Sequence, residues 1–528
     1  MTAPLSIQLP AHLVGERLTL SAAVLLTRGT GDDLELYLVR RSPHLATFPG
    51  AWALPGGVLD PAIDGDPVAD GTSAFLACAA RELFEETGVL LPSLREAAAR
   101  HGVGEQAVLV NLRAELCTPL RDGHGPLRAA AIFRRLIEDT QLPCRELEPF
   151  CWTTTPAFAA RRYRALYVHA ECPAGEHPHV EEGELVEGRF LRPKEAWRAW
   201  HAGEMRLVPP LVFLLDHLAR PGATLTGALA AARERGDEVD GGALHVVSPS
   251  PGILVAPLAT PTLPPATTTN CYIVGREQAY VVDPATWDES ERARLFGFLD
   301  VAQRFDLELA GVLVTHHHRD HVGSVAHVAE RYQLPVFAHP RTLRRLPIRP
   351  RDGRELADGD ILDLGRAPGG RDEPWSLTAL HTPGHDTGHL CFLESHRRAV
   401  LAGDMVSTLS TIQIDPPEGH LATYLASLER LLRLDVGALL PAHGSAAPDG
   451  PALITRYLAH RAERERHLEG ALRTVGAGLV ESLVPLVYAD IPRAMHNLAA
   501  RSLLAGLEKL AEEGRARMHL DGRWLPLP

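Results

Sequence analysis

The run His-His-His-Arg-Asp-His at residues 316–321 constrains the fold of this chain more than any other feature of its sequence. The run follows the apolar stretch Gly311 to Val314, which predicts a loop at the carboxyl end of a buried strand, where α/β folds usually place ligands. Apart from His317, the run offers four imidazole or carboxylate groups within six residues, which cannot form a hydrophobic core. Neutral imidazoles with one carboxylate suit Zn²⁺ better than Ca²⁺ or Mg²⁺. The run therefore predicts a zinc site in an α/β domain.

Three more ligand-type residues follow apolar runs later in the chain: His385 in Thr-Pro-Gly-His, Asp404 in Ala-Gly-Asp and His443 in Pro-Ala-His-Gly. With the first run they give seven ligand-type side chains, which are His316, His318, Asp320, His321, His385, Asp404 and His443. Seven groups exceed what one tetrahedral zinc needs, and a bridging carboxylate lets two metals share a hydroxide. The set predicts a binuclear site.

This segment resembles the metallo-β-lactamase superfamily, whose His-x-His-x-Asp-His motif it matches in full. The resemblance implies two Zn²⁺ ions, one held by His316, His318 and His385, the other by Asp320, His321 and His443, with Asp404 bridging them. It also implies a bridged water as nucleophile, with Asp320 assisting proton transfer, and Asp283 supporting the ligands from behind.

Three histidines near these ligands have other expected roles. His317 alternates with the ligands and should point away from the metals, so we interpret it as structural. His389 lies four residues after His385, and two roles stay open for it, contact with substrate or support of the ligands. His339 is expected to pack within a loop.

A second candidate site lies nearer the N-terminus. The apolar spacing of residues 74–87, with Gly88 as a stop, predicts a helix on which Glu82, Glu85 and Glu86 lie on one side. The tight loop 54–57 would approach it closely. Such a row of carboxylates is either a solvated acidic surface or a site for Mg²⁺ and a diphosphate.

Residues 81–89 resemble the second half of the Nudix hydrolase signature. The resemblance implies that Glu82, Glu85 and Glu86 hold Mg²⁺ or Mn²⁺ with the Gly57 carbonyl, while Arg81 orients a glutamate; we assign catalytic roles to Arg81 and Glu86. Ser73 stands eight residues before Arg81, where the family has that glutamate. The loop after Gly57 is lengthened and resembles the coenzyme A diphosphatase branch. An inactive, regulatory Nudix domain is the alternative.

These patterns predict an α/β multi-domain chain. We expect a Nudix-like α/β/α sandwich over residues 16–218, a linker over 219–243, a metallo-β-lactamase-like αβ/βα sandwich over 244–450 and a winged-helix tail over 451–528. The tail follows from three helical stretches and a terminal hairpin. Runs 20–26 and 34–39 predict a hairpin at the start of the first domain.

Composition narrows the environment and the partners. The net charge of 53 − 66 = −13 argues against a general affinity for nucleic acid. The seven cysteines include no C-x-x-C pair, and so predict neither a disulfide framework nor a thiolate zinc site. No run of 18 apolar residues occurs, and the first fifteen residues lack the pattern of an export signal, so we expect a cytoplasmic protein without a membrane partner.

The sequence thus predicts a hydrolase with two metal sites acting on small molecules. The first would cleave nucleoside diphosphate derivatives, including coenzyme A or its acyl forms, and the second a thioester or other ester. One alternative is a single-stranded RNA endoribonuclease, with Tyr457, Tyr488 and Trp524 as base-stacking candidates in a tail whose arginines alternate with glutamates. Another is a scaffold without catalysis. The oligomeric state stays open.

Overall fold

The computed structural model describes residues 13, 16–45, 47–117, 127–140, 146–304, 307–369 and 372–528. The chain divides into two compact units, Met1–Pro156 with Arg161–Ala243, and Ala157–Ala160 with Leu244–Pro528. No export signal was expected in the first fifteen residues, and of these only Leu13 is among the described residues. Cys144 also lies outside the described residues. The six described cysteines are free. Among the described residues, no helix has the length and apolar character needed to cross a membrane.

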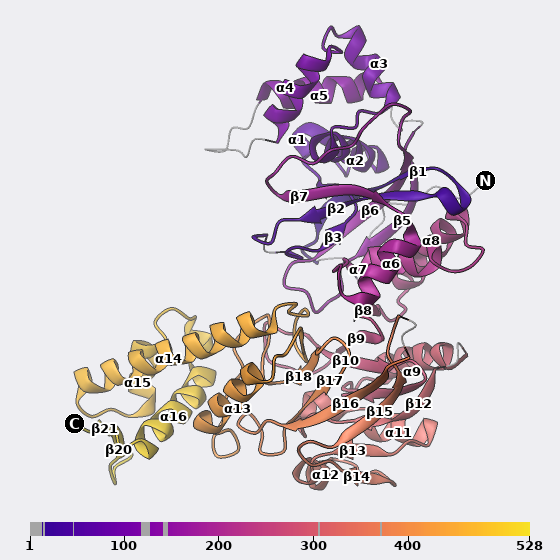
Figure 1. Ribbon diagram of the computed structural model, residues 1–528. Coiled ribbons are helices and arrows are strands. Elements are labelled where there is room, and N and C mark those ends of the chain that lie inside the picture. The colour runs from indigo at the N-terminus through magenta and orange to yellow at the C-terminus, as the bar shows by residue number, and fades with distance from the viewer. Residues whose placement is uncertain are drawn as a thin grey trace. The chain divides into compact units, whose positions relative to one another are not determined.

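The first unit is built on one mixed sheet of seven strands (Figure 1). The strands are β1 (Thr19–Arg28), β2 (Glu35–Arg41), β3 (Trp52–Ala53), β4 (Gly56–Val58), β5 (Glu148–Thr154), β6 (Tyr163–Glu171) and β7 (Leu185–Leu191). They follow the order β3-β2-β1-β6-β5, and β4 and β7 pair with β1 and β2. The predicted hairpin is confirmed, because β1 and β2 pair antiparallel.

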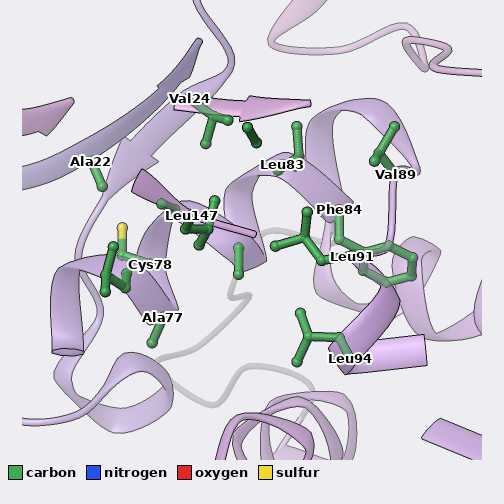
Figure 2. Packing of buried hydrophobic residues seen from close by; sticks show 14 of the residues in the cluster. Ala22, Val24, Ala77, Cys78, Leu83, Phe84, Val89, Leu91, Leu94 and Leu147 are labelled. Carbon is green, nitrogen blue, oxygen red and sulfur yellow. The ribbon is translucent and has the colours of Figure 1, made fainter. Parts of the chain in front are cut away.

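Helices cover both faces of this sheet. They are α1 (Pro61–Asp64), α2 (Thr72–Thr87), α3 (Pro92–Arg100), α4 (Gln106–Leu116), α5 (Leu127–Asp139), α6 (Pro193–Ala202), α7 (Pro209–Leu218) and α8 (Leu225–Asp240). Successive side chains of β1 enter different cores, since Val24 and Leu26 pack with α2 to α5 and Leu25 packs with α6 to α8. Figure 2 shows the first core, in which Leu83 and Phe84 of α2 lie among these side chains. The predicted α/β/α sandwich is confirmed.

The interval 219–243 is not the linker that its charged, glycine-containing sequence suggested. Most of it forms α8, which packs against β5 of the first unit. Arg233 of α8 donates to the carbonyls of Pro149 and Phe150 at 3.0 and 3.1 Å, and Arg164 makes a bidentate ion pair with Asp240 at 2.7 and 2.6 Å. The charges that suggested a solvated connection hold the helix to its own sheet.

The second unit contains two larger sheets that face each other. The first has the order β14-β13-β12-β11-β10-β9-β8 and the second β15-β16-β17-β18-β19. The first comprises β8 (Val247–Ser250), β9 (Ile253–Ala259), β10 (Thr268–Gly275), β11 (Gln278–Val282), β12 (Glu308–Leu313), β13 (Val336–Ala338) and β14 (Gly353–Glu355). The second comprises β15 (Ile361–Arg366), β16 (Pro374–His381), β17 (Leu390–Glu394), β18 (Val400–Gly403) and β19 (Leu439–Pro441).

Three cores give this unit its αβ/βα layers, as predicted. Tyr272 and Val282 of the first sheet meet Trp375 and Phe392 of the second in the inner core. Helices α9 (Glu289–Arg304) and α11 (Val325–Tyr332) cover the outer face of the first sheet. Helix α13 (Leu421–Arg433) and the start of α14 (Gly450–Val475) cover that of the second. The short helices α10 (Arg319–Val322) and α12 (Pro340–Arg345) lie in the loops between strands.

The C-terminal part is the predicted winged helix. The end of α14 packs with α15 (Val480–Val487), α16 (His496–Glu512) and the hairpin of β20 (Ala516–Met518) and β21 (Trp524–Pro526). Trp524 is 5% exposed in this small core, and Leu503 and Leu507 of α16 are also buried there. The tail therefore has a hydrophobic core of its own beside α14.

The packing of α8 on β5 predicts that a glycine-to-alanine substitution in this helix is destabilising, the opposite of its usual effect. A β-carbon on Gly236 would lie 2.6 Å from the backbone carbonyl oxygen of Trp152, which cannot turn aside. In an open helix, Gly→Ala stabilises by about 0.5–1 kcal/mol. We expect Gly236→Ala instead to lower the free energy of unfolding of the first unit, as measured by urea titration. Gly470→Ala in α14, where a β-carbon meets nothing within 4 Å, is the control and should stabilise its unit. A stabilised Gly236→Ala protein would contradict the packing of α8 on β5.

Candidate functional site

Strand ends of the two facing sheets bring the predicted zinc ligands together. The run 316–321 follows β12, and His385 lies in the loop between β16 and β17. Asp404 directly follows β18 and His443 follows β19. Each ligand lies in a segment that follows a buried strand. The rigid sheets therefore fix the backbone positions from which the ligand side chains extend.

The first group of ligand atoms consists of three imidazole nitrogens. His318 Nδ1 lies 3.0 Å from His316 Nε2 and 3.0 Å from His385 Nε2. His316 is fully buried and His385 is nearly so. These atoms therefore converge on one point, as a metal held by the three residues requires.

The second group joins carboxylates to imidazoles. His443 Nε2 lies 3.5 Å from Asp320 Oδ2 and 3.4 Å from Asp404 Oδ1. His321 Nε2 lies 3.6 Å from the same Asp404 oxygen. The other oxygen of Asp404 lies 3.5 Å from His385 Nε2, in the first group. Asp404 thus faces both groups with different oxygens, which is the arrangement of a bridging ligand.

The short distances between ligand atoms, and the lack of hydrogen-bond partners for two of them, indicate that these side chains fit divalent metals. Nitrogens 3.0 Å apart leave room for one proton at most between them, and the buried atoms His321 Nε2 and Asp404 Oδ1 have no hydrogen-bond partner among the described residues. Burial and the neighbouring His385 lower the pKa of His318 to about 3, so this imidazole stays neutral and keeps its lone pair. Neutral imidazoles and carboxylates at one point are a metal-binding donor set.

Four of the imidazoles direct Nε2 toward the ligand groups and place Nδ1 within hydrogen-bond distance of another protein group. His321 Nδ1 lies 2.8 Å from Asp283 Oδ2, and His316 Nδ1 lies 3.0 Å from Thr315 Oγ1. His385 Nδ1 and His443 Nδ1 contact the carbonyl oxygens of residues 413 and 268, at 2.9 and 3.0 Å. These contacts fix each ring so that Nε2 faces the centre. Asp283 therefore lies behind the ligands, where the resemblance places it.

His389 contacts the backbone of the candidate ligand Asp404, which favours support of the ligands among its two open roles. It is fully buried, and its Nε2 accepts the backbone N–H of Asp404 at 3.1 Å. Its Nδ1 lies 2.9 Å from Thr382 Oγ1. A β-carbon on Gly403 would come within 2.5 Å of His389 Nε2, so a glycine is needed beside it.

The other two histidines lie outside the two groups described above, although the ring of His317 lies in a further group of ligand-type side chains with His318, Asp386 and Glu418. His317 turns away and pairs with Asp386, Nδ1 to Oδ2 at 2.7 Å, which ties the two ligand-bearing loops together. His339 precedes α12 and stacks on His381, with ring centroids 4.4 Å apart and planes 5° apart.

Two helices hold a loop of the site: α14, most of which was assigned to the tail, and α13, which lies in the predicted metallo-β-lactamase-like domain. Tyr457 of α14 donates to the carbonyl of Ser410 at 2.7 Å and accepts the backbone N–H of Ser407 at 2.7 Å. Tyr424 of α13 donates to the carbonyl of Met405 at 2.7 Å. These hydroxyls hold the loop that leaves Asp404. Sequence patterns gave no signal for this role, because the helices and the loop are far apart in the chain.

The interpretation of the tail's aromatic residues as base-stacking platforms is wrong for two of the three. Tyr457 is 6% exposed and Trp524 is 5% exposed, so neither offers a free ring face. Tyr488 is half-buried, with the guanidinium of Arg464 over its ring. Near the C-terminus, Arg515 pairs with Glu469 and Glu513.

In the first unit, a residue that the sequence did not single out completes the Nudix-like site. Arg81 donates from Nε and Nη2 to the two carboxylate oxygens of Asp64, each at 2.8 Å. Asp64 closes α1, which begins within the lengthened loop. Asp64, and not the residue at position 73, therefore makes the carboxylate pairing with Arg81 that the resemblance assigns to a glutamate. The insertion follows Asp64, so counting back from Arg81 reached the wrong residue.

The three glutamates lie on one side of α2, around Arg81 and β4. Arg81 Nη1 donates to Glu82 at 2.8 Å and to Glu85 at 3.1 Å, while Glu86 accepts the backbone N–H of Gly56 at 2.8 Å. A β-carbon on Gly57 would lie 2.4 Å from the Glu82 carboxylate, so only glycine allows this approach. The glutamate oxygens are not among the convergent ligand groups of the described residues, all of which lie in the second unit.

Electrostatics favour a hard cation here. Burial, opposed by Arg81 and reinforced by Glu82, raises the pKa of Glu85 to about 8. Burial and Glu82 likewise raise the pKa of Glu86, and Glu184 adds a further negative charge nearby. Oxygen donors with excess negative charge are what Mg²⁺ or Mn²⁺ prefers. Glu184, which stands before β7 and is exposed, is a candidate that sequence reasoning did not single out as a site residue.

Comparison with known proteins supports this division of the chain. Residues 264–443 match the metallo-beta-lactamase superfamily, residues 480–524 match the beta-lactamase associated winged helix domain, and residues 17–115 match the NUDIX domain. The atrochrysone carboxyl ACP thioesterase of Aspergillus novofumigatus is 30% identical over 271 residues, covering 48% of this chain and 77% of that protein.

Two solved structures share parts of the fold. A metallo-beta-lactamase family protein of Thermus thermophilus is 23% identical, with a TM-score of 0.43, covering 52% of this chain and 99% of its own. The NUDIX hydrolase of Alicyclobacillus acidocaldarius is 22% identical, with a TM-score of 0.32, covering 40% of this chain and 96% of its own.

The pairing of Arg81 with Asp64 predicts which substitution disrupts the first site. The side chains are 6% and 1% exposed, so Asp64→Asn removes a charge that a buried guanidinium needs. We expect the unfolding free energy of the first unit to fall by about 3 kcal/mol, the low end for a broken buried pair, because Glu82 and Glu85 still contact Arg81. Ser73→Ala is the control and should change it by less than about 0.5 kcal/mol. Equal effects in denaturant titrations would contradict the assignment of Asp64.

Proposed function

The chain belongs to the metallo-β-lactamase superfamily and is a metal-dependent hydrolase with an added NUDIX domain, and from this premise we propose that its second unit hydrolyses acyl thioesters. The observation that carries the proposal is Asp404 between two ligand groups, one oxygen toward His321 and His443 and the other toward His385. A similar protein that bears a thioesterase name supports the choice of substrate class.

The proposed mechanism assigns each ligand to one of two metals. His316, His318 and His385 would hold one Zn²⁺, Asp320, His321 and His443 the other, and Asp404 both. Metals bound there would lower the pKa of a water and polarise the thioester carbonyl. The products are a carboxylic acid and a free thiol.

Asp320 is the residue we propose for proton transfer. Its side chain is 19% exposed, against 11% for Asp404, so it is the carboxylate of the site that substrate reaches more readily. It would accept the proton of the attacking water and deliver it to the sulfur as the carbon–sulfur bond breaks. Asp283 contributes by keeping His321 oriented, with its proton on Nδ1.

For the first unit we propose Nudix-type hydrolysis of a diphosphate. The observation that favours this second activity is the bidentate Arg81–Asp64 pair, which anchors α2 and its glutamates against the loop of Gly57. Glu82, Glu85 and Glu86 would hold Mg²⁺ or Mn²⁺, which neutralises the charge of the diphosphate and activates water. Nucleoside diphosphate derivatives, coenzyme A and acyl-coenzyme A are the proposed substrates.

Thioester hydrolysis predicts a clear loss on removing one ligand. In the full-length protein loaded with Zn²⁺, we expect thiol release from a neutral acyl thioester, and a decrease of about 100-fold or more in His318→Ala together with loss of bound zinc measured by elemental analysis. His467→Ala, at an exposed histidine of α14, is the control and should change neither quantity. Zinc-dependent cleavage of single-stranded RNA without thiol release would replace this proposal with the ribonuclease.

The proposed diphosphatase is tested separately at α2. We expect Mg²⁺-dependent cleavage of one or more nucleoside diphosphate derivatives or coenzyme A, followed by chromatography, to fall about 100-fold or more in Glu86→Gln. Glu96→Gln, at an exposed position of α3, should leave the rate unchanged. Thioester hydrolysis should be equal in all three proteins. A full diphosphatase rate in Glu86→Gln would refute the assignment of this glutamate.

A further inference from the structure

The segment 339–354 concentrates positive charge beside the zinc ligands. It contains six arginines and one aspartate, a net charge of 6 − 1 = +5 in a chain whose net charge is −13. The arginines are all exposed, and they are Arg341, Arg344, Arg345, Arg349, Arg351 and Arg354. The sign of this local charge is opposite to that of the chain as a whole.

Contacts of α12 place this charge next to the ligand-bearing loop. Thr342 Oγ1 donates to the carbonyl of Gly388 at 3.0 Å, three residues after the ligand His385. A β-carbon on Gly388 would lie 3.2 Å from the Cβ of Arg341, so that arginine lies directly against the loop. Arg345, at the other end of α12, pairs with Glu418, whose carboxylate lies in one group with the ring nitrogens of His317 and His318.

Half of the six arginines are already neutralised within the chain. Arg345 pairs with Glu418, Arg351 with Glu330 at 3.1 Å and Arg354 with Asp352 at 2.9 Å. The other three, Arg341, Arg344 and Arg349, form no ion pair with any residue that the structure describes. We call these three the open arginines.

The local potential agrees with this description. Burial, followed by His381 and Arg341, lowers the pKa of His339 to about 4, with Arg344 acting in the same direction and Asp386 against it. The imidazole of His339, near Arg341 and Arg344, is therefore neutral. The positive charge of this surface comes from guanidinium groups. A guanidinium offers a planar pair of N–H donors that matches phosphate oxygens.

We propose that the open arginines bind the phosphate of a thioester whose thiol arm ends in phosphate, as the 4′-phosphopantetheine part of coenzyme A does. The inference rests on the proposed thioester hydrolysis and names its substrate class. Arg341 lies against the ligand-bearing loop, Arg344 follows it on α12, and Arg349 follows in the same segment. All three are exposed, so they suit a charged group at the far end of a long thiol arm. The reacting carbonyl would lie at the zinc ligands while the phosphate lies on α12 and the residues after it.

Two substrates that differ only in the phosphate test the contact between that phosphate and the open arginines. The same acyl group is attached to pantetheine and to 4′-phosphopantetheine, neither of which contains the diphosphate that the first unit is proposed to cleave. We expect the full-length, Zn²⁺-loaded triple variant Arg341→Gln, Arg344→Gln, Arg349→Gln to show a KM raised about tenfold for the phosphorylated thioester, with kcat unchanged. Its kinetics on the pantetheine thioester should equal those of the parent. Raising the salt concentration should weaken the parent's preference, because exposed charges are screened.

The control carries the same change of charge elsewhere in the unit. Arg456→Gln, Arg466→Gln and Arg517→Gln lie at exposed positions of α14 and β20 and should leave both KM values unchanged. An equal KM rise in this control, or none in the first variant, would overturn the inference. If the parent cleaves neither thioester, the proposed function fails; calorimetric binding of free 4′-phosphopantetheine then tests the open arginines alone, and equal affinity of parent and variant overturns them.

Discussion

The hydrogen bonds of the buried Asp283 carboxylate are the interaction on which the rest of the candidate metal site depends. One oxygen accepts the backbone N–H of Thr315 at 2.8 Å, and the other accepts its hydroxyl at 2.6 Å and faces His321 Nδ1 at 2.8 Å. Asp283 ends β11 with φ of 47°, a left-handed conformation that aspartate tolerates better than most residues. An ionised carboxylate only accepts hydrogen bonds, so this contact favours a proton on His321 Nδ1 and directs Nε2 toward the other candidate ligands.

Both candidate sites use the same physical device, in which a buried aspartate from one segment orients a charged or polar group of another. Asp64 holds Arg81 in the first unit, as Asp283 holds His321 in the second. In each case the supporting group is more buried than the groups that would meet substrate. A site arranged this way keeps its geometry when the metal is absent, since the support does not depend on the ligands themselves.

The sequence is informative where a function is local and less so where it depends on insertion or packing. The run 316–321 and the helix of Glu82 can be recognised because their ligands lie within one or two turns of chain. Asp64 cannot be found by counting, because the residues added between α1 and α2 change the spacing. Residues 219–243 resemble a linker in composition, since the arginines that dock α8 look the same in sequence as solvated ones. The alternation of strand-like and helical runs after residue 244 predicted an α/β layered domain, whereas the sandwich of the first unit was expected from the resemblance to the Nudix hydrolases.

In the C-terminal tail, the number of charged residues likewise does not predict how those charges are arranged. The tail is rich in arginine, yet Arg464 pairs with Asp490 and Arg515 with Glu469, while the guanidinium of Arg461 is buried against the loop after Asp404. Aromatic residues are only 5% of the chain, and the tail places Tyr457 and Trp524 inside its cores rather than on its surface. Part of the positive charge of the tail is therefore taken up by ion pairs and buried contacts, and two of its three candidate rings have no free face on which a base could stack. At the start of α14, Tyr457 and Arg461 instead form hydrogen bonds with the loop after Asp404, so this part of the helix holds the loop that follows the proposed bridging ligand.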